Sequence, residues 1–531
     1  MKKLKLYIPI IVLLSLVACK KSFLDTEDVT TATEQNFYKT PNDAWKALVG
    51  VYDGMQRAGA SGSGLDVVAT EVMSDDAFGG TGNADGLGFQ MMDEFDKDRS
   101  PSDQDLFGDN WKAYYKGVYR ANMLLTHLDQ VDWKGSEGLR KVYESEARFI
   151  RAYLYFDMVR FWGNIPLITK PTTDNVPQAN PDSVYRLIAE DLKFAAENLP
   201  SISYADQDPA THGRVTKWAA ESLLGRVYLY YTGYYSKPDL VGVVNQAQAL
   251  AYLEDVISKG GFGLVSNFAN LWPAASINNY AGEDNQETVF ATKYTYTSDW
   301  NGNVDGNQWL VMLGIRVQTI PPYGLGWGAA TVDPKLWNAY DANDTRRSAS
   351  IISIADENLD FKNKKDQREY TGYYWKKYTP MADASGTSLA EKMGGVSFQI
   401  SQFQDYVSIR YADILLMAAE LGSPNAQQYF DLVRRRAFGS NFVQVPVNKA
   451  NILNERKLEF AGEGIRYWDL LRQGINVAAS TIAETTTVEN GGVAATKAIS
   501  ASKITETQGL AQIPNSQITL SDGVLKQNTG W

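Results

Sequence analysis

The sequence predicts a mainly α-helical fold with an irregular, loop-rich region in its middle. Apolar residues recur at helical spacing in several segments before residue 260 and again after residue 407. Between residues 260 and 405 this periodicity fades, and glycine, asparagine, tyrosine and tryptophan dominate. A chain of 531 residues is long enough to build a large hydrophobic core around such elements.

The helical segments can be placed in order along the chain. Pro41-Asn42-Asp43 opens the first, which runs to about Arg57. Further helices are expected at about 103–128, 138–162, 181–199, 215–233, 246–259, 408–420, 425–437 and 449–472. The adjacent pairs suggest helix–turn–helix stacking of the tetratricopeptide kind, although no clean 34-residue repeat is present.

Two long segments are expected to be loops. Residues 59–100 are rich in glycine, serine and aspartate, and residues 260–405 contain only short alternating pieces, such as 287–294, that suggest a few strands. A loop-rich tail is expected after residue 472. We therefore treat residues 37–531 as a single domain. Its helical scaffold is expected at about 37–58, 103–259 and 408–472, and its loop-rich side at about 59–100 and 260–405.

The amino terminus reads as a secretory signal. Three lysines precede an apolar run from about residue 7 to residue 17, which is shorter than the ~20 residues needed to span a bilayer. The run ends in L-V-A-C at Cys19, which resembles the lipobox of bacterial lipoproteins. The resemblance implies cleavage before Cys19 and acylation of that residue. Residues 1–18 would then be the signal peptide and residues 19–36 a lipidated tether.

Charge and composition argue against several classes of function. The net charge is −11 and no basic block is present, so nucleic-acid binding is not expected. The two histidines lie in no metal-ligand pattern. The segment 301–307 loosely resembles a calcium loop but lacks its first aspartate and its glutamate at position twelve. Another calcium site is left open without support, and no cofactor is expected.

Acidic and basic residues alternate through the segment 454–472, NERKLEFAGEGIRYWDLLR. Paired carboxylates of this kind would suit a glycosidase. Each acid, however, has an arginine nearby at helical spacing, which keeps it ionised. We favour an ion network that holds helices together.

A larger set of stretches occurs in one order across almost the whole chain. They are CKKSFLD (19–25), EARFIRAYLYFD (146–157), WGNIPLI (162–168), VTKWAA (215–220), LGRVYL (224–229), RYADILLMAAE (410–420), NER through EGIRYWDLLR (454–472), IP (513–514) and QNTGW (527–531). Together they resemble the SusD/RagB family of outer-membrane lipoproteins from Bacteroidetes-type bacteria. The closing QNTGW lacks the proline that usually precedes the final glycine in that family.

The resemblance implies tetratricopeptide-like helix pairs on one side and an irregular ligand-binding side with a few short strands. It implies a lipid-anchored protein at the cell surface, in the outer membrane, that binds glycan. The implied partner is a SusC-like TonB-dependent outer-membrane transporter, to which oligosaccharide is delivered. Some members capture peptides instead. The family is not known for catalysis.

Sugar binding needs flat aromatic platforms beside carboxylate and amide side chains. Residues 294–327 combine both, and the candidate platforms there are Trp300, Trp309, Trp327, Tyr323 and Tyr296. In the first long loop the candidates are Asp76, Phe78 and Asn83. The alternative is that these aromatic residues pack the loops onto the scaffold.

Four functions are weighed on this basis. The favoured one is a surface glycan-binding protein, and the second is a peptide-binding uptake lipoprotein of the same family. The third, a lipoprotein glycosidase, needs two carboxylates ~5–9.5 Å apart, for which Asp75, Asp76 and Asp299 are available without a motif. The fourth, a helical scaffold that binds only protein, predicts exposed aromatic residues on the concave helical face.

Overall fold

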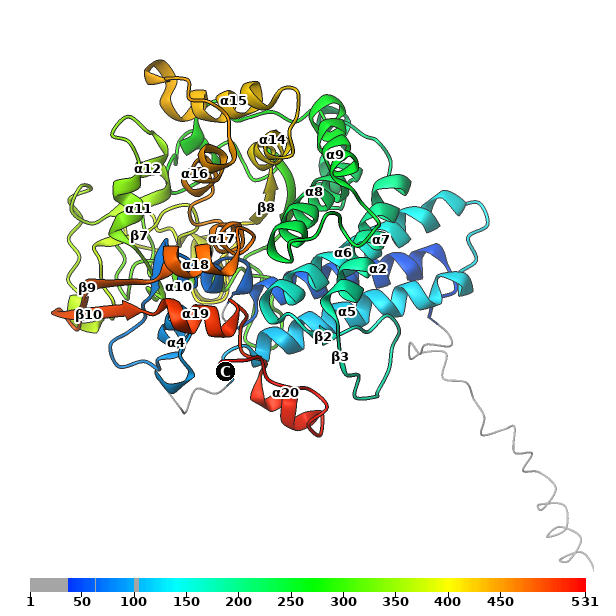
Figure 1. Ribbon diagram of the computed structural model, residues 1–531, viewed down its shortest axis with the longest axis horizontal. Helices are drawn as coiled ribbons and strands as arrows, with labels where there is room; N and C mark the ends of the chain where they lie inside the picture. The colour runs from blue at the N-terminus through cyan, green and yellow to red at the C-terminus, as the bar shows by residue number, and fades with distance from the viewer. Residues whose placement is uncertain (1–36, 63, 100–104) are drawn as a thin grey trace, which may run out of the picture.

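The computed structural model describes residues 37–62, 64–99 and 105–531 (Figure 1). The predicted signal peptide, the lipidation site Cys19 and the tether at 19–36 lie outside these residues. Within the described part of the chain, every helix is too short or too polar to cross a bilayer.

A first group of long helices forms one side of the molecule, on the right in Figure 1. It consists of α2 (Pro41–Ala60), α5 (Gly108–His127), α6 (Glu137–Trp162), α7 (Pro181–Asn198), α8 (Lys217–Tyr234) and α9 (Gln246–Lys259). Successive members pack on one another from α5 to α9, and α2 packs on α5 and α6. The predicted positions of these helices and their stacking in pairs are confirmed.

The helix starts follow from local sequence. Thr40 and Asn245 form capping boxes with Asp43 and Gln248, and the Asn180 side chain accepts a hydrogen bond in the first turn of α7. Each cap satisfies backbone N–H groups that have no partner within the helix. Helix α6 is buried on nearly all sides along its second half, as its apolar residues predict.

A second helical group packs on the first through contacts of α14 with α8 and α9. It consists of α14 (Tyr411–Glu420), α15 (Ala426–Phe438), α16 (Lys449–Glu459) and α17 (Arg466–Leu471). The single helix expected at 449–472 is wrong, because the chain turns between α16 and α17. Gly462 and Gly464 adopt φ of +77° and +74° in that turn, a conformation that ends a helix.

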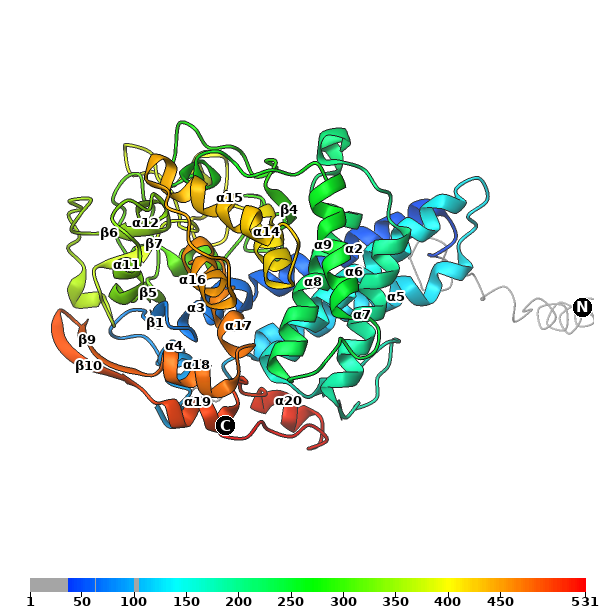
Figure 2. The same cartoon turned by 45° about the horizontal axis from the view of Figure 1, so that its top comes forward.

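The loop-rich side lies on the left in Figures 1 and 2 and contains only short elements. The helical ones are a π-helical turn (Leu65–Ala69), α3 (Thr70–Val72), α4 (Gly88–Glu94), α10 (Trp309–Leu313), α11 (Pro334–Ala339), α12 (Arg346–Ser350) and α13 (Leu389–Lys392). The strands pair as β1 (Ala77–Gly79) with β5 (Ala330–Val332), β4 (Thr288–Thr292) with β8 (Tyr406–Arg410), and β6 (Ile351–Ser353) with β7 (Tyr373–Trp375). The strand expected at 287–294 is confirmed as β4.

The C-terminal tail is more ordered than expected. It contains α18 (Ile475–Ile482), the antiparallel hairpin of β9 (Glu484–Asn490) and β10 (Val493–Ile499), α19 (Ala501–Thr507) and α20 (Asn515–Leu520). The expectation of a loop-rich tail is therefore wrong in this part. The hairpin turns at Gly491 and Gly492, both with positive φ, and a Gly-Gly turn between β-branched residues is a signal that the sequence carries.

One main hydrophobic core joins both sides of the molecule. Its largest fully buried side chains include five tryptophans: Trp162, Trp218, Trp272, Trp309 and Trp375. The first two lie in the helical scaffold and the other three on the loop-rich side. Aromatic side chains therefore fill the core on both the helical side and the loop-rich side.

Candidate ligand-binding site

The two long loop segments meet through a short antiparallel pair of strands. Strand β1 pairs with β5, so that Phe78 lies opposite Thr331. Beyond the strands the pairing continues, since the Thr81 N–H donates to the Gly328 carbonyl at 2.7 Å. Residues 80–82 are thereby placed beside residues 327–329, although more than two hundred positions separate them in the chain.

An open cleft of about 810 Å³ lies where these segments meet. Its walls come from residues 81–92, from residues 312–329, and from two pairs of residues at 105–106 and 515–516. The apolar lining is Phe89, Met92, Leu106, Met312 and Trp327. The polar lining includes Asp85, Asp105, Arg316, Asn515 and Ser516. An aromatic and thioether floor with carboxylate, hydroxyl and amide groups at hand suits a ligand with both apolar faces and hydroxyls.

Arg316 organises the charged part of this cleft. Its Nη1 lies 3.3 Å from Asp85 Oδ2 and its Nε lies 3.2 Å from Asp366 Oδ2. Nη1 also donates to the backbone carbonyl of Trp327 at 3.3 Å. A Cβ on Gly82 would collide with the guanidinium, so a side chain at this position would displace Arg316. Arg316 thus connects the two loops and holds the backbone of Trp327.

Only some of the predicted contact residues lie near the cleft. Trp327 lines it and is half-buried. Asn83 is exposed on the loop that supplies Thr81 and Asp85. Trp300 is 65% exposed, but it belongs with the half-buried Tyr296 to another loop and is not among the residues that line the cleft.

Two predicted platforms are core residues. Trp309 is fully buried, with its ring 5.2 Å from that of Tyr378 and 5.8 Å from that of Tyr406. Tyr323 is buried, and its hydroxyl donates to Glu357 at 2.5 Å. The prediction that they contact ligand is wrong, because packing removes their ring faces from solvent.

The predictions for Asp76 and Phe78 are wrong for the same reason. Phe78 is buried within β1. Asp76 is fully buried, and its Oδ1 lies 3.2 Å from Lys457 Nζ. Burial raises the pKa of Asp76 to about 6, although the lysine opposes this shift. Asp76 is therefore part of the buried scaffold.

Known proteins resemble this chain along most of its length. A family model described as "SusD family" matches residues 358–531, and a model described as "Starch-binding associating with outer membrane" matches residues 63–229. The chain belongs to the SusD/RagB family. The curated relatives include SusD-like protein P25 of Formosa agariphila, 24% identical over 90% of both chains, and SusD-like protein P2 of the same organism, 26% identical over 89% of this chain and 91% of that one.

Solved SusD-like structures share the fold. A laminarin-binding SusD-like protein is 29% identical, with a TM-score of 0.72 over 93% of this chain and 100% of that one. Surface glycan-binding protein A from Bacteroides thetaiotaomicron, in complex with laminarihexaose, is 24% identical with a TM-score of 0.74 and the same coverage. The predicted SusD-like fold class is confirmed.

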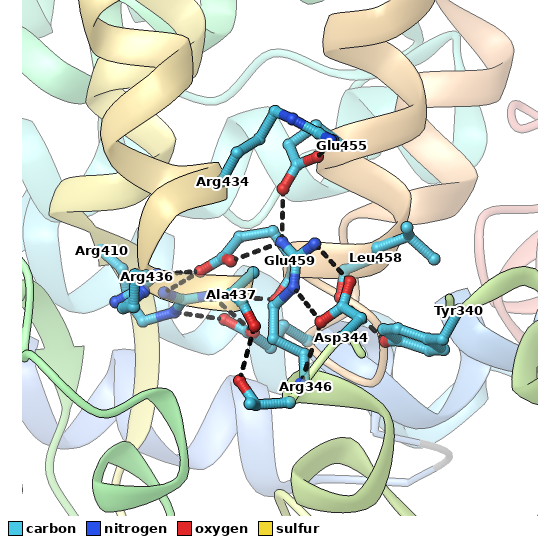
Figure 3. A network of polar contacts seen from close by, with 12 residues as sticks. Tyr340, Asp344, Arg346, Arg410, Arg434, Arg436, Ala437, Glu455, Leu458 and Glu459 are labelled. Atoms are coloured by element: carbon cyan, nitrogen blue, oxygen red, sulfur yellow. Dashed lines mark hydrogen bonds and ion pairs between the residues drawn. The ribbon is translucent and has the colours of Figure 1, made fainter. Parts of the chain in front are cut away.

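The charged segment 454–472 forms an ion network in this SusD-like scaffold, as the sequence predicts (Figure 3). Glu455 and Glu459, however, pair with arginines from other segments and not at helical spacing. The buried Arg346 lies 2.6 Å from Glu455 and 2.9 Å from Glu459, and Arg410 lies 2.9 Å from the same Glu459. Burial alone would raise the pKa of Glu459, but Arg436, Arg410 and Arg346 lower it well below its usual range. These carboxylates are paired inside the protein and are not available to a substrate.

Several residues that line the cleft are not predicted from the sequence. Phe89, Met312 and Arg316 lie in the predicted loops, but nothing in their local sequence sets them apart from packing residues. Asn515 and Ser516 come from the tail, where no ligand contact was expected. Among the described residues, no group of three or more histidine, cysteine, aspartate or glutamate side chains is arranged to hold a metal ion.

Proposed function

We propose that this SusD-like protein binds oligosaccharide or polysaccharide in the cleft beside Trp327. It releases the glycan unchanged to a SusC-like TonB-dependent outer-membrane transporter. Lipid on Cys19 anchors it at the cell surface. Residues 37–531 form the unit that carries the glycan.

The composition of the cleft is the observation that carries this proposal. Trp327 and Phe89 offer apolar ring faces, while Asp85, Asp105 and Asn515 offer groups that bond hydroxyls. A sugar ring has apolar C–H faces edged by hydroxyls, so this arrangement matches its chemistry. The volume of about 810 Å³ accommodates several sugar rings.

The relatives support the same ligand class. The 29% identical structure is that of a laminarin-binding SusD-like protein, and the second family model is described as starch-binding. That description also names association with the outer membrane, in keeping with the lipobox-like sequence at Cys19.

The charged residues of the cleft favour binding over hydrolysis. Asp85 is held in an ion pair with Arg316, whereas a glycosidase needs one protonated and one ionised carboxyl facing each other across the bond to be cleaved. Asp105, the other acid among the described residues that line the cleft, is exposed, whereas the general acid of a glycosidase lies in an apolar environment.

Affinity electrophoresis against a polysaccharide panel that includes laminarin and starch tests the proposal, with calorimetry for any polymer that retards the protein. We expect Trp327→Ala to weaken binding at least tenfold and Trp300→Ala, outside the cleft, to leave it unchanged. Reducing-end assays should detect no product. Binding to no glycan, binding to peptides alone, or an unchanged affinity of Trp327→Ala would overturn the assignment.

A further inference from the structure

A second groove of about 380 Å³ lies beside the candidate cleft. One wall is α5, another is the connection between β2 (Ile165–Pro166) and β3 (Gln178–Ala179), and the third is the end of α20 with the residues that follow it. Figure 1 shows α20 between α4, which borders the first cleft, and the chain around β2 and β3, and α20 packs on α5.

The α5 wall carries a row of aromatic side chains. Trp111, Tyr115 and Tyr119 are spaced four residues apart and therefore share one face of the helix. They span about 12 Å at a rise of 1.5 Å per residue. Trp111 is buried and Tyr115 is half-buried, with its hydroxyl donating to the Pro166 carbonyl at 2.9 Å. Tyr119 is 47% exposed, so packing does not explain its place in this row.

The facing walls supply polar groups and one more apolar contact. Thr172, Asp174 and Asn175 are exposed on the β2–β3 connection. Gln517 and Leu520 come from α20, and Leu520 is 70% exposed. The groove thus combines an aromatic surface with hydroxyl, carboxylate and amide groups, which is the same combination that lines the first cleft.

The two hollows share two of their walls. On α20, Asn515 and Ser516 line the first cleft, and Gln517 and Leu520 line the groove. Just before α5, residues 105–106 line the first cleft, and within α5 residues between 111 and 119 line the groove. The two walls meet where the Ser516 N–H lies 3.5 Å from Asp105 Oδ1, so a ligand chain that extends from the first cleft to Tyr119 has to pass over this contact.

We propose that this groove is a second subsite for the same glycan chain. A polymer bound beside Trp327 continues past Ser516 and lies over Tyr119, with Leu520 against its other side. The ligand is therefore an extended polysaccharide, and a trisaccharide occupies only the first cleft. This inference rests on the proposed function.

Chain-length dependence tests the groove separately from the cleft. Affinities for laminarin and laminaritriose are compared in the full-length protein and in Tyr119→Ala, Leu520→Ser and Trp327→Ala. We expect Tyr119→Ala and Leu520→Ser each to weaken laminarin binding about fivefold and to leave laminaritriose binding unchanged. Trp327→Ala should weaken both. Val443→Ser serves as a control, because Val443 is also 70% exposed and lies outside both hollows.

If Tyr119→Ala and Leu520→Ser bind laminarin as tightly as the wild type while Trp327→Ala binds both ligands more weakly, the groove is not a second subsite. The proposed function would still stand. Equal losses for the two ligands would overturn the second subsite as well, since they indicate a general structural effect. Wild-type protein that binds neither laminarin nor any other glycan of the panel would overturn both proposals.

Discussion

The guanidinium of Arg316 and the carboxylate of Asp85 form an ion pair in the wall of the candidate cleft, with 3.3 Å between Nη1 and Oδ2. The two residues come from the two long loop segments, and the same guanidinium nitrogen bonds the Trp327 carbonyl. Through Arg316, the position of Trp327 therefore depends on the ion pair with Asp85.

Replacing Arg316 by methionine should weaken glycan binding about tenfold, because Trp327 loses its backbone contact and Asp85 loses its counter-charge. The free energy of unfolding should fall by no more than about 1 kcal/mol, since half-exposed pairs contribute little. Calorimetry and urea unfolding measure the two effects. Lys362→Met removes an exposed cation that is paired with Asp360 and is the matched control. Unchanged affinity in Arg316→Met would contradict this role.

Asp413 should govern part of the acid denaturation. Burial alone would raise its pKa, but Arg456 and Arg226, which contact its two oxygens, lower it to about 2. Because the folded pKa lies below the unfolded value, this stability is present above about pH 4 and is lost as pH falls toward 2. It amounts to about 2 kcal/mol.

Asp413→Asn leaves the Arg226 guanidinium without its counter-charge, while Arg456 keeps its ion pair with Asp469. We therefore expect the free energy of unfolding to fall by about 3 kcal/mol at pH 7. Urea unfolding at several pH values should show the gap to the wild type narrowing between pH 4 and pH 2. Asp129→Asn, at an exposed side chain, should change neither quantity. A gap that stays constant with pH would be evidence against the pKa assignment.

Glu283 should make the protein less stable as pH rises, whereas Asp413 makes it less stable as pH falls. Burial, together with the nearby Asp405, raises the pKa of Glu283 to about 9, and its Oε1 accepts the Asp405 N–H at 2.9 Å. The folded protein therefore holds the proton at neutral pH. Its contribution to stability is complete below the unfolded pKa of about 4.3 and is lost as pH rises toward 9.

Glu283→Gln keeps the accepting oxygen and removes the titration, so stability should depend less on pH between 5 and 9. Thermal unfolding across that range measures the slope. The exposed Glu190→Gln should keep the slope of the wild type. If the thermal stability of Glu283→Gln falls as steeply with rising pH as that of the wild type, other groups cause the pH dependence.

Gly462→Ala should destabilise the turn between α16 and α17. Gly462 has φ +77°, and an added Cβ would lie 2.7 Å from Cε3 of the buried Trp375. Backbone strain and the clash together should cost about 2–4 kcal/mol, measured by urea unfolding. Gly50→Ala, inside α2 with no other atom within 4 Å, should be neutral or stabilising by up to about 1 kcal/mol. Equal effects at both positions would contradict this account.

The sequence by itself determined the helical scaffold. Apolar spacing and capping residues are local signals, so α2, α6, α7 and α9 lie within a few residues of their predicted positions. The alternation of acids and arginines in 454–472 likewise predicted an ion network, but the arginines that pair with Glu455 and Glu459 come from other segments of the chain. Gly462 and Gly464 are a local signal for the turn between α16 and α17. The helix predicted at 449–472 nevertheless runs through both glycines.

Only the tertiary structure decided which aromatic residues are available to a ligand. Trp300, Trp309 and Trp327 lie in one segment of uniform composition, yet the first is exposed, the second is buried and the third lines the cleft. Their burial depends on partners far away in the chain, such as Tyr378 and Tyr406 beside Trp309. The sequence around a tryptophan does not identify these partners. They exclude water from its ring only after the chain has folded, because they are distant in sequence.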